Sequence, residues 1–160
     1  MLSNTFKATL YIRFFGIWKI PMIFYCRPKV IKLTENEIVI KIPLLRRTKN
    51  HLKSMYIGIL TVGADLAGGF LAMNQINKSR HKLSLVFKDM QANYLKRAEG
   101  DVHFTCKDGA RIRAMIEQAV SSGERVNQTV SVTATVPSLL GAESVSEFKL
   151  TLSIKKINSF

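Results

Sequence analysis

The chain has 160 residues, of which 47% are hydrophobic and 22% are charged, and its formal net charge is +13. This length and balance indicate one globular domain over residues 1–160 with a substantial core, and they exclude an intrinsically disordered chain. The positive charge favours an anionic partner. Two basic clusters, Arg46-Arg47-Lys49 and Arg80-His81-Lys82, lack the interleaved aromatic residues of a stacking platform, so we do not expect nucleic-acid binding.

Residues 1–28 form an apolar N-terminal extension. Arg13, Lys19 and Pro21 interrupt its apolar residues, so no run reaches the roughly 20 residues that cross a bilayer, and we do not expect stable membrane insertion. We expect a helix that packs on the domain and ends or kinks at Pro21. A helix that lies on a membrane surface is the alternative.

The cysteines and histidines do not form a metal-binding pattern. Cys26 and Cys106 lack the paired spacing of a zinc site, and two cysteines make no disulfide framework, which favours a reducing, cytoplasmic location. His51, His81 and His103 are scattered along the chain. We therefore expect no metal site.

Two strands follow the extension, at Val30–Leu33 and Glu37–Leu44, with a turn at residues 34–36 between them. Alternate residues of the second strand are apolar, which predicts one buried face and one polar face. The apolar residues are Ile38, Ile40, Ile42 and Leu44.

The segment from Tyr56 to Ile76 predicts a long helix. Asp65 is the only charged residue between Tyr56 and Met73, and apolar residues occur all round the helix, so the helix should be buried on most sides. A transmembrane span is the alternative, but a carboxylate near the middle of a span is costly in lipid. Apolar surroundings should raise the pKa of the Asp65 carboxyl.

After this helix, apolar residues again alternate with polar ones, which predicts four further strands. Asp108 is placed to cap a short helix over Ala110–Val120 that ends at Gly123, between the second and third of these strands. The order of elements predicts an α+β domain. The apolar positions of the four strands are Leu83, Leu85 and Phe87; Val102, Phe104 and Cys106; Val126, Val130, Val132, Ala134 and Val136; and Phe148, Leu150, Leu152 and Ile154.

This order resembles the hot-dog fold, in which an antiparallel sheet wraps around one long central helix. The residues also resemble the signature of phenylacetate-pathway acyl-CoA thioesterases, in which an asparagine precedes a His-Gly-Gly sequence and an acidic residue follows it. Asn50, Gly58 and Asp65 occupy those positions here. The inserted helix Ala110–Val120 is most similar to a less characterised hot-dog branch, which is grouped as domains of unknown function.

The chain departs from the thioesterase signature at several positions. Tyr56 replaces the histidine, Ile57 replaces the next glycine, and Lys53 replaces an earlier glycine. Phe87 stands where many members carry serine or threonine. Catalysis by the family route is therefore an expectation that the resemblance supports only in part.

The resemblance implies an acyl-CoA thioesterase without a cofactor, apart from the coenzyme A of its substrate. Asp65 would act as the general base on the attacking water or, as the alternative, as a nucleophile on the carbonyl, and Asn50 would orient the thioester or the water. Backbone N–H groups of Tyr56, Ile57 and Gly58 at the helix start would polarise the thioester carbonyl. The acid would come from the partner subunit's helix, so the active protein would be a homodimer or a dimer of dimers.

Each of these roles has an alternative. Asp65 could be a structural carboxylate in an interface, and Asn50 could cap a turn. The protein could be a non-catalytic hot-dog module that binds acyl-CoA or fatty acyl ligands. The candidates for binding the phosphates of coenzyme A are Arg97, Lys96, Arg80 and Lys82, and each could equally be a solvated surface charge.

Overall fold

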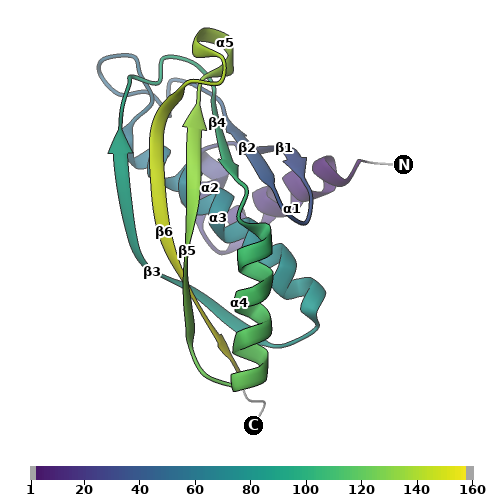
Figure 1. The fold of residues 1–160 in the computed structure, drawn as a ribbon. Coiled ribbons are helices and arrows are strands. Elements are labelled where there is room, and N and C mark those ends of the chain that lie inside the picture. The colour runs from purple at the N-terminus through teal and green to yellow at the C-terminus, as the bar shows by residue number, and fades with distance from the viewer. Residues whose placement is uncertain (1–2, 158–160) are drawn as a thin grey trace.

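The computed structural model describes residues 3–157, and it has the predicted order of elements (Figure 1). A second helix in the N-terminal extension and a one-turn helix before the last strand were not predicted. The elements are α1 (Asn4–Trp18), α2 (Pro21–Tyr25), β1 (Lys29–Leu33), β2 (Ile38–Ile42), α3 (Ile57–Ser79), β3 (Leu83–Tyr94), β4 (Val102–Cys106), α4 (Gly109–Ser122), β5 (Val126–Thr135), α5 (Pro137–Leu140) and β6 (Ser144–Lys156).

The six strands form one antiparallel sheet in the order β1-β2-β4-β5-β6-β3, which curves around α3 (Figure 1). The predicted alternation is confirmed for β2, β4, β5 and β6, because their apolar positions form the core. Those fully or almost fully buried are Ile38, Ile40, Ile42, Val102, Phe104, Cys106, Val130, Val132, Ala134, Phe148, Leu150, Leu152 and Ile154.

β3 differs from the other long strands because it lies at an edge of the sheet and pairs only with β6. Leu83 and Leu85 are half-buried and Phe87 is exposed, so the prediction of one buried face was wrong for this strand. An edge strand has a neighbour on one side only, and α3 covers less of its surface. The register of β3 shifts between Phe87 and Asp89, which is a β-bulge.

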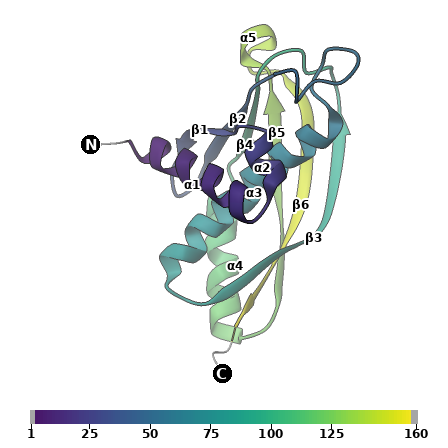
Figure 2. The same cartoon turned by 180° about the vertical axis from the view of Figure 1, so that it is seen from behind.

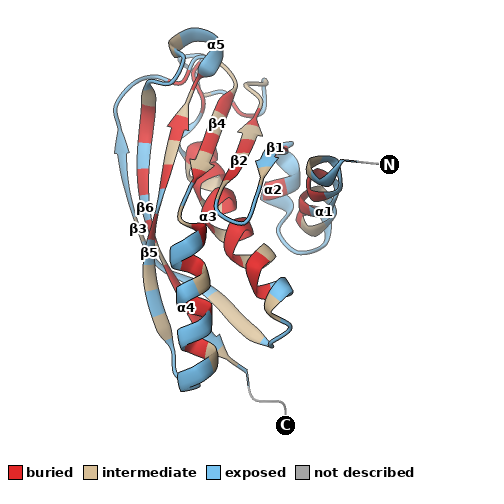
Figure 3. Ribbon diagram, turned by 45° about the vertical axis from the view of Figure 1, so that its right-hand side comes forward, coloured by how far each residue is buried: buried red, intermediate tan, exposed pale blue. Residues whose placement is uncertain are grey.

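α3 is the central helix of the domain, and most of its residues are buried (Figure 3). Its length and hydropathy would suffice for a membrane span, but 56% of the apolar window is buried inside the domain. Gly63 allows the helix to approach the sheet closely, since a Cβ atom there would lie 2.2 Å from Cζ of Phe104. α3 is followed by Arg80, its C-cap residue, which has the left-handed conformation.

α4 packs beside α3, buries Ile112, Met115, Ile116 and Ala119 on one face, and ends at Gly123 as expected. The side chain of Gln75 on α3 joins α4 to the β1–β2 turn. The Gln75 Nε2 group donates to the carbonyls of Glu35 at 2.7 Å and Gly109 at 3.0 Å. Asp108 precedes α4 but does not cap it through its side chain. Its carboxylate instead accepts from the backbone N–H of Ser131 at 2.7 Å.

The N-terminal extension forms two helices that lie across α3 on the side that the sheet leaves open (Figure 2). Pro21 occupies the first turn of α2, so it begins a second helix rather than merely ending the first. α1 is anchored through Ile12, which is 1% exposed, and through Thr9, whose hydroxyl accepts from Val30 N–H at 2.9 Å. The extension therefore forms a third layer over the central helix.

Candidate functional site

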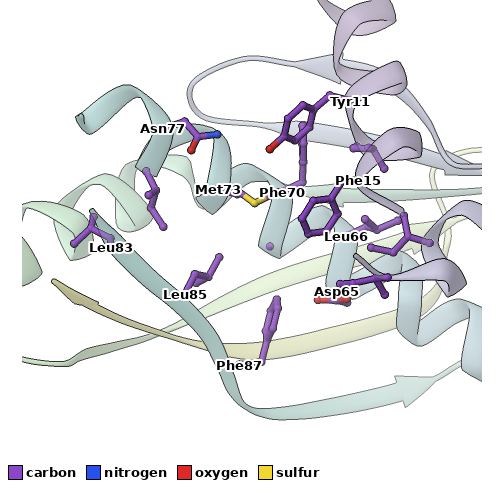
Figure 4. A pocket seen from close by; sticks show the side chains of 15 residues that line it. Tyr11, Phe15, Asp65, Leu66, Phe70, Met73, Asn77, Leu83, Leu85 and Phe87 are labelled. Carbon is purple, nitrogen blue, oxygen red and sulfur yellow. The ribbon is translucent and has the colours of Figure 1, made fainter. Parts of the chain in front are cut away.

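An elongated cavity of about 490 Å³ lies between α3, β3 and the two N-terminal helices (Figure 4). Along α3 it extends from Asp65 to Asn77, which corresponds to roughly 18 Å of helix. Asp65 is the only carboxylate in a lining that is otherwise almost entirely apolar. Such a cavity has the size of a small-molecule site and suits a long apolar group with one reactive end.

Asp65 lies at one end of this cavity, next to Phe87 (Figure 4). Among residues 3–157 its carboxylate has no ion-pair partner, and desolvation is the only cause of its pKa shift. Burial in apolar surroundings raises the pKa of Asp65 to about 6. The predicted direction is confirmed, and a carboxylate with this pKa is a stronger base than an exposed aspartate while remaining ionised at neutral pH.

The space beside Asp65 depends on Gly69, one helical turn further along α3. A Cβ atom on Gly69 would lie 2.9 Å from Cζ of Phe87 and 3.6 Å from Oδ1 of Asp65. The Phe87 ring, next to the register shift in β3, lies against this part of the helix. A phenyl ring thus occupies the position where many thioesterases of the resembled type have a hydroxyl group.

The start of α3 presents two free backbone donors. The N–H of Tyr56 donates to the carbonyl of Thr48 at 2.9 Å, so this residue is not available to polarise a substrate. Within the described part of the chain, no acceptor binds the N–H groups of Ile57 and Gly58. The predicted set of three donors is therefore reduced to two, at the positive end of the helix dipole.

Asp65 and these donors cannot act on one carbonyl within one chain. Eight residues separate Ile57 from Asp65 on the same helix, which corresponds to about 12 Å along its axis. A water molecule held by the carboxylate could not reach a carbonyl bound at the helix start. A site that uses both features must take them from two copies of the chain, as the resemblance implies.

Asn50 lies outside the cavity and organises the loop before α3. Its Oδ1 accepts from the N–H groups of Leu52 at 2.9 Å and Ser54 at 3.2 Å, and its Nδ2 donates to the Ser54 hydroxyl at 3.0 Å. Asn50 and Asp65 are not brought together within one chain. The geometry corresponds to the alternative role of Asn50 as a turn cap.

The four cations considered for coenzyme A phosphates lie at opposite ends of α3. Lys96 and Arg97 are near the helix start, where they pair with Glu143 and Glu99, and a guanidinium N–H of Arg97 donates to the carbonyl of Leu52. Arg80 and Lys82 flank the other end of the helix. Only Lys96 and Arg97 lie near the free N–H groups of their own chain.

The contribution of the N-terminal helices to the cavity was not predicted. Tyr11, Phe15 and Ile20 line it, and the ring of Tyr11 lies 5.9 Å from that of Phe70 on α3, measured between centroids. The sequence signal was present, because α1 is apolar on all sides rather than on one stripe. A helix of this kind has a second apolar face that is free to line a cavity.

Comparisons with known proteins agree with this architecture. The crystal structure of PA5026 from Pseudomonas aeruginosa, described as a protein of unknown function and probable thioesterase, has a TM-score of 0.77 at 23% identity, covering 93% of this chain and 96% of that chain. A mutant form of the thioesterase PA1618 from Pseudomonas aeruginosa has a TM-score of 0.70 at 11% identity, covering 98% and 97%. Thioesterase HI1161 from Haemophilus influenzae has a TM-score of 0.65 at 13% identity, covering 86% and 85%.

These similarities establish the fold class: the protein has the hot-dog fold, with structural neighbours that include two thioesterases and one probable thioesterase. The family model described as "Domain of unknown function (DUF4442)" matches residues 11–154, so the chain belongs to that family. No curated protein sequence matches the chain.

Proposed function

We propose that the protein is an acyl-CoA thioesterase with Asp65 as its general base. The observation that carries the proposal is the carboxylate itself, which has a pKa raised to about 6 and stands at one end of an elongated apolar cavity. The acyl chain would lie in the cavity along α3, and the thioester would lie at the Asp65 end. The structural neighbours that are thioesterases support the same class of reaction.

In the proposed reaction, the Asp65 carboxylate accepts a proton from water, and the resulting hydroxide adds to the thioester carbonyl. The N–H groups of Ile57 and Gly58 from another copy stabilise the negative charge on the carbonyl oxygen. The carbon–sulfur bond then breaks, coenzyme A leaves as a thiolate, and the proton held by Asp65 is passed to it. Lys96 and Arg97 near the helix start are the candidates to meet the phosphates of coenzyme A.

The proposed site requires a homodimer, and the free edge of β3 supports one. β3 has 12 residues and no partner on its outer side within the described chain, and Val86 and Phe87 are 50% and 39% exposed. A long edge strand with an unpaired outer side is a template for pairing with a second copy. Pairing there would bring another protomer close to Asp65, because Phe87 contacts the same part of α3.

The buried free thiols of Cys26 and Cys106 support a reducing, cytoplasmic location as part of this proposal. Burial raises the pKa of both thiols to about 11, so they are protonated and unreactive.

A panel of acyl-CoA substrates of increasing chain length, with release of the thiol measured, tests the proposal. We expect turnover by the unaltered protein, with kcat rising about tenfold per pH unit up to a midpoint near pH 6 as Asp65 loses its proton. Asp65→Asn should lower kcat at least 100-fold, whereas Glu117→Gln on the exposed face of α4 should not change it. Undiminished turnover by Asp65→Asn would show that Asp65 is not the base.

Two observations favour a second function, the binding of acyl-CoA or fatty acids without turnover. Phe87 lies against Gly69, one helical turn from Asp65, where thioesterases of the resembled type place a hydroxyl group, and the amide of Asn50 is used by its own loop. Calorimetry with a non-hydrolysable acyl-CoA separates the two functions. Saturable binding together with no thiol release from any substrate would establish the binding module.

A further inference from the structure

The N-terminal helices leave a large apolar surface uncovered. α1 packs on the domain through one face, on which Ala8, Ile12 and Gly16 lie, but its opposite face is also apolar. Exposed apolar patches of this kind mark interaction sites on soluble domains. The N-terminal apolar surface is defined here by six exposed side chains of α1 and α2: Phe6, Leu10, Phe14, Ile17, Trp18 and Met22.

The spacing on α1 makes this surface continuous. Four of these residues lie on one stripe of the helix, because they follow one another at intervals of four, four and three residues. They are Phe6, Leu10, Phe14 and Ile17. Trp18 at the end of α1 is 80% exposed, which is unusual for the largest apolar side chain. A continuous stripe of exposed apolar side chains on a helix calls for an external partner.

The same region is strongly basic. The first 34 residues contain six lysine or arginine residues and no aspartate or glutamate. Among residues 3–157, no ion pair involves Lys7, Lys19, Arg27 or Lys29. The N-terminal apolar surface thus belongs to a segment whose positive charge these ion pairs leave largely unneutralised.

The loop before α3 adds a further cation to this region. The guanidinium carbon of Arg47 lies 5.3 Å from the ring centroid of Tyr25 at the end of α2. This contact holds a basic segment, which also contains Arg46 and Lys49, beside the second helix.

We propose that α1 and α2 dock the protein on the surface of an anionic lipid bilayer. The N-terminal apolar surface enters the interfacial region, and the surrounding cations meet the headgroups, which is how interfacial helices with aromatic and basic residues bind. A second copy of the chain is a poorer occupant. A symmetric contact would bring identical cations together with no acidic residue of either segment to pair with them.

The docked orientation would place the bilayer next to the cavity. Tyr11 and Ile20 line the cavity and are 48% and 41% exposed, so α1 and α2 border its opening. An acyl chain leaving the bilayer at this surface would enter the cavity without crossing open water. This consequence rests on the proposed function, whereas the docking itself does not.

Trp18 is the only tryptophan in the chain, so its fluorescence reports directly on the proposed surface. Vesicles of phosphatidylglycerol and phosphatidylcholine should shift its emission to shorter wavelength, and lipids brominated in their acyl chains should quench it. Vesicles of pure phosphatidylcholine should have at least tenfold weaker binding in a sedimentation assay. Raising the salt concentration should weaken binding to the anionic vesicles.

Matched variants separate a specific surface from general basicity. Lys7→Gln combined with Lys19→Gln should weaken vesicle binding about 25-fold, since each cation near an anionic surface contributes roughly fivefold. Lys107→Gln combined with Lys149→Gln removes the same charge from exposed positions outside the N-terminal region and should have little effect. Phe14→Ser combined with Ile17→Ser should weaken binding at least tenfold, whereas Leu139→Ser on α5 should not.

Three results would overturn the proposal. One is the absence of any Trp18 shift and of sedimentation with anionic vesicles. Another is an equal loss of binding in both pairs of lysine variants, which would mean attraction by net charge alone. The third is a Trp18 shift that depends on protein concentration without lipid, which would show that a second copy covers the surface. Hydrolysis of a soluble short-chain acyl-CoA, measured in the same variants, tests the proposed function separately.

Discussion

The two sides of α3 differ sharply although one continuous apolar segment forms both. On the side facing the sheet, Gly63 lies against the ring of Phe104, and the contact leaves no space for even a methyl group. On the other side, only two residues further along, Asp65 has a carboxylate without an ion-pair partner in the described chain and faces a cavity. The first side stabilises the domain. The second leaves an energetically costly group in place, which is typical of functional sites.

Ile57→Pro should have the largest effect on the proposed site that uses the open side of α3. It removes one backbone N–H at the start of the helix. Proline is favoured at the first helical position, and Tyr56 already has the extended conformation (φ −66°, ψ 138°) that a following proline requires. The variant should therefore fold normally while kcat falls about 100- to 1000-fold. Circular dichroism checks the fold, and thiol release measures the activity.

Mixing this variant with Asp65→Asn sharpens the result, because each chain lacks a different half of the site. If the halves come from two copies, a randomly reassembled equal mixture should recover about a quarter of the unaltered activity, since half the dimers contain one intact site of two. Recovery of no activity after subunit exchange would mean that both halves belong to one chain.

The pH dependence of stability tests the electrostatic cost of the open side. The folded-state pKa of Asp65, about 6, lies above the roughly 3.9 of an unfolded aspartate, so the folded protein binds this proton more tightly. The contribution of this proton to the free energy of unfolding is therefore favourable below pH 4, and it is lost as pH rises to about 6. Asp65→Asn should raise the free energy of unfolding by up to about 3 kcal/mol at pH 8 and by little at pH 4. Urea unfolding at both values, at one protein concentration, measures the difference.

Gly63→Ala tests the closed side. The new methyl group would lie 2.2 to 2.5 Å from three atoms of the Phe104 ring, so the free energy of unfolding should fall by about 2 kcal/mol. Gly68→Ala on the same helix is the control, because its nearest neighbour would be Val130 Cγ2 at 3.4 Å, an ordinary contact. That substitution should be neutral or slightly stabilising, since alanine favours helix. Equal destabilisation by both would contradict the close packing at Gly63.

Met73→Trp should have the smallest effect and tests the path of the acyl chain. Met73 lines the middle of the cavity, two helical turns from Asp65, so a larger side chain should block long acyl chains only. We expect kcat/KM to fall about tenfold for long-chain substrates and to stay unchanged for short ones, a difference of about 1.4 kcal/mol. Met73→Leu keeps the volume and serves as the control. A uniform loss for all chain lengths would place the acyl group elsewhere.

Much of the fold follows from local patterns in the sequence. The alternation in β4, β5 and β6 determines which side chains are buried, because successive residues of a strand point to opposite faces whatever the strand pairs with. The long apolar run with one carboxylate likewise predicts a buried central helix, and the resemblance at Asn50, Gly58 and Asp65 indicates the hot-dog fold. These features depend on residues close together in the chain.

Only the tertiary structure decided where the open side of α3 lies. β3 has the alternation of a half-buried strand, yet its edge position leaves Phe87 exposed beside Asp65. The hydrogen bond from Tyr56 N–H to Thr48 leaves two donors rather than three at the helix start, and the loop contacts of Asn50 remove its amide from the cavity. Each outcome depends on contacts between segments distant in sequence, which local periodicity does not contain. Asp65 itself was evident from the sequence, but its cavity exists only because α1 and α2 cover the same helix.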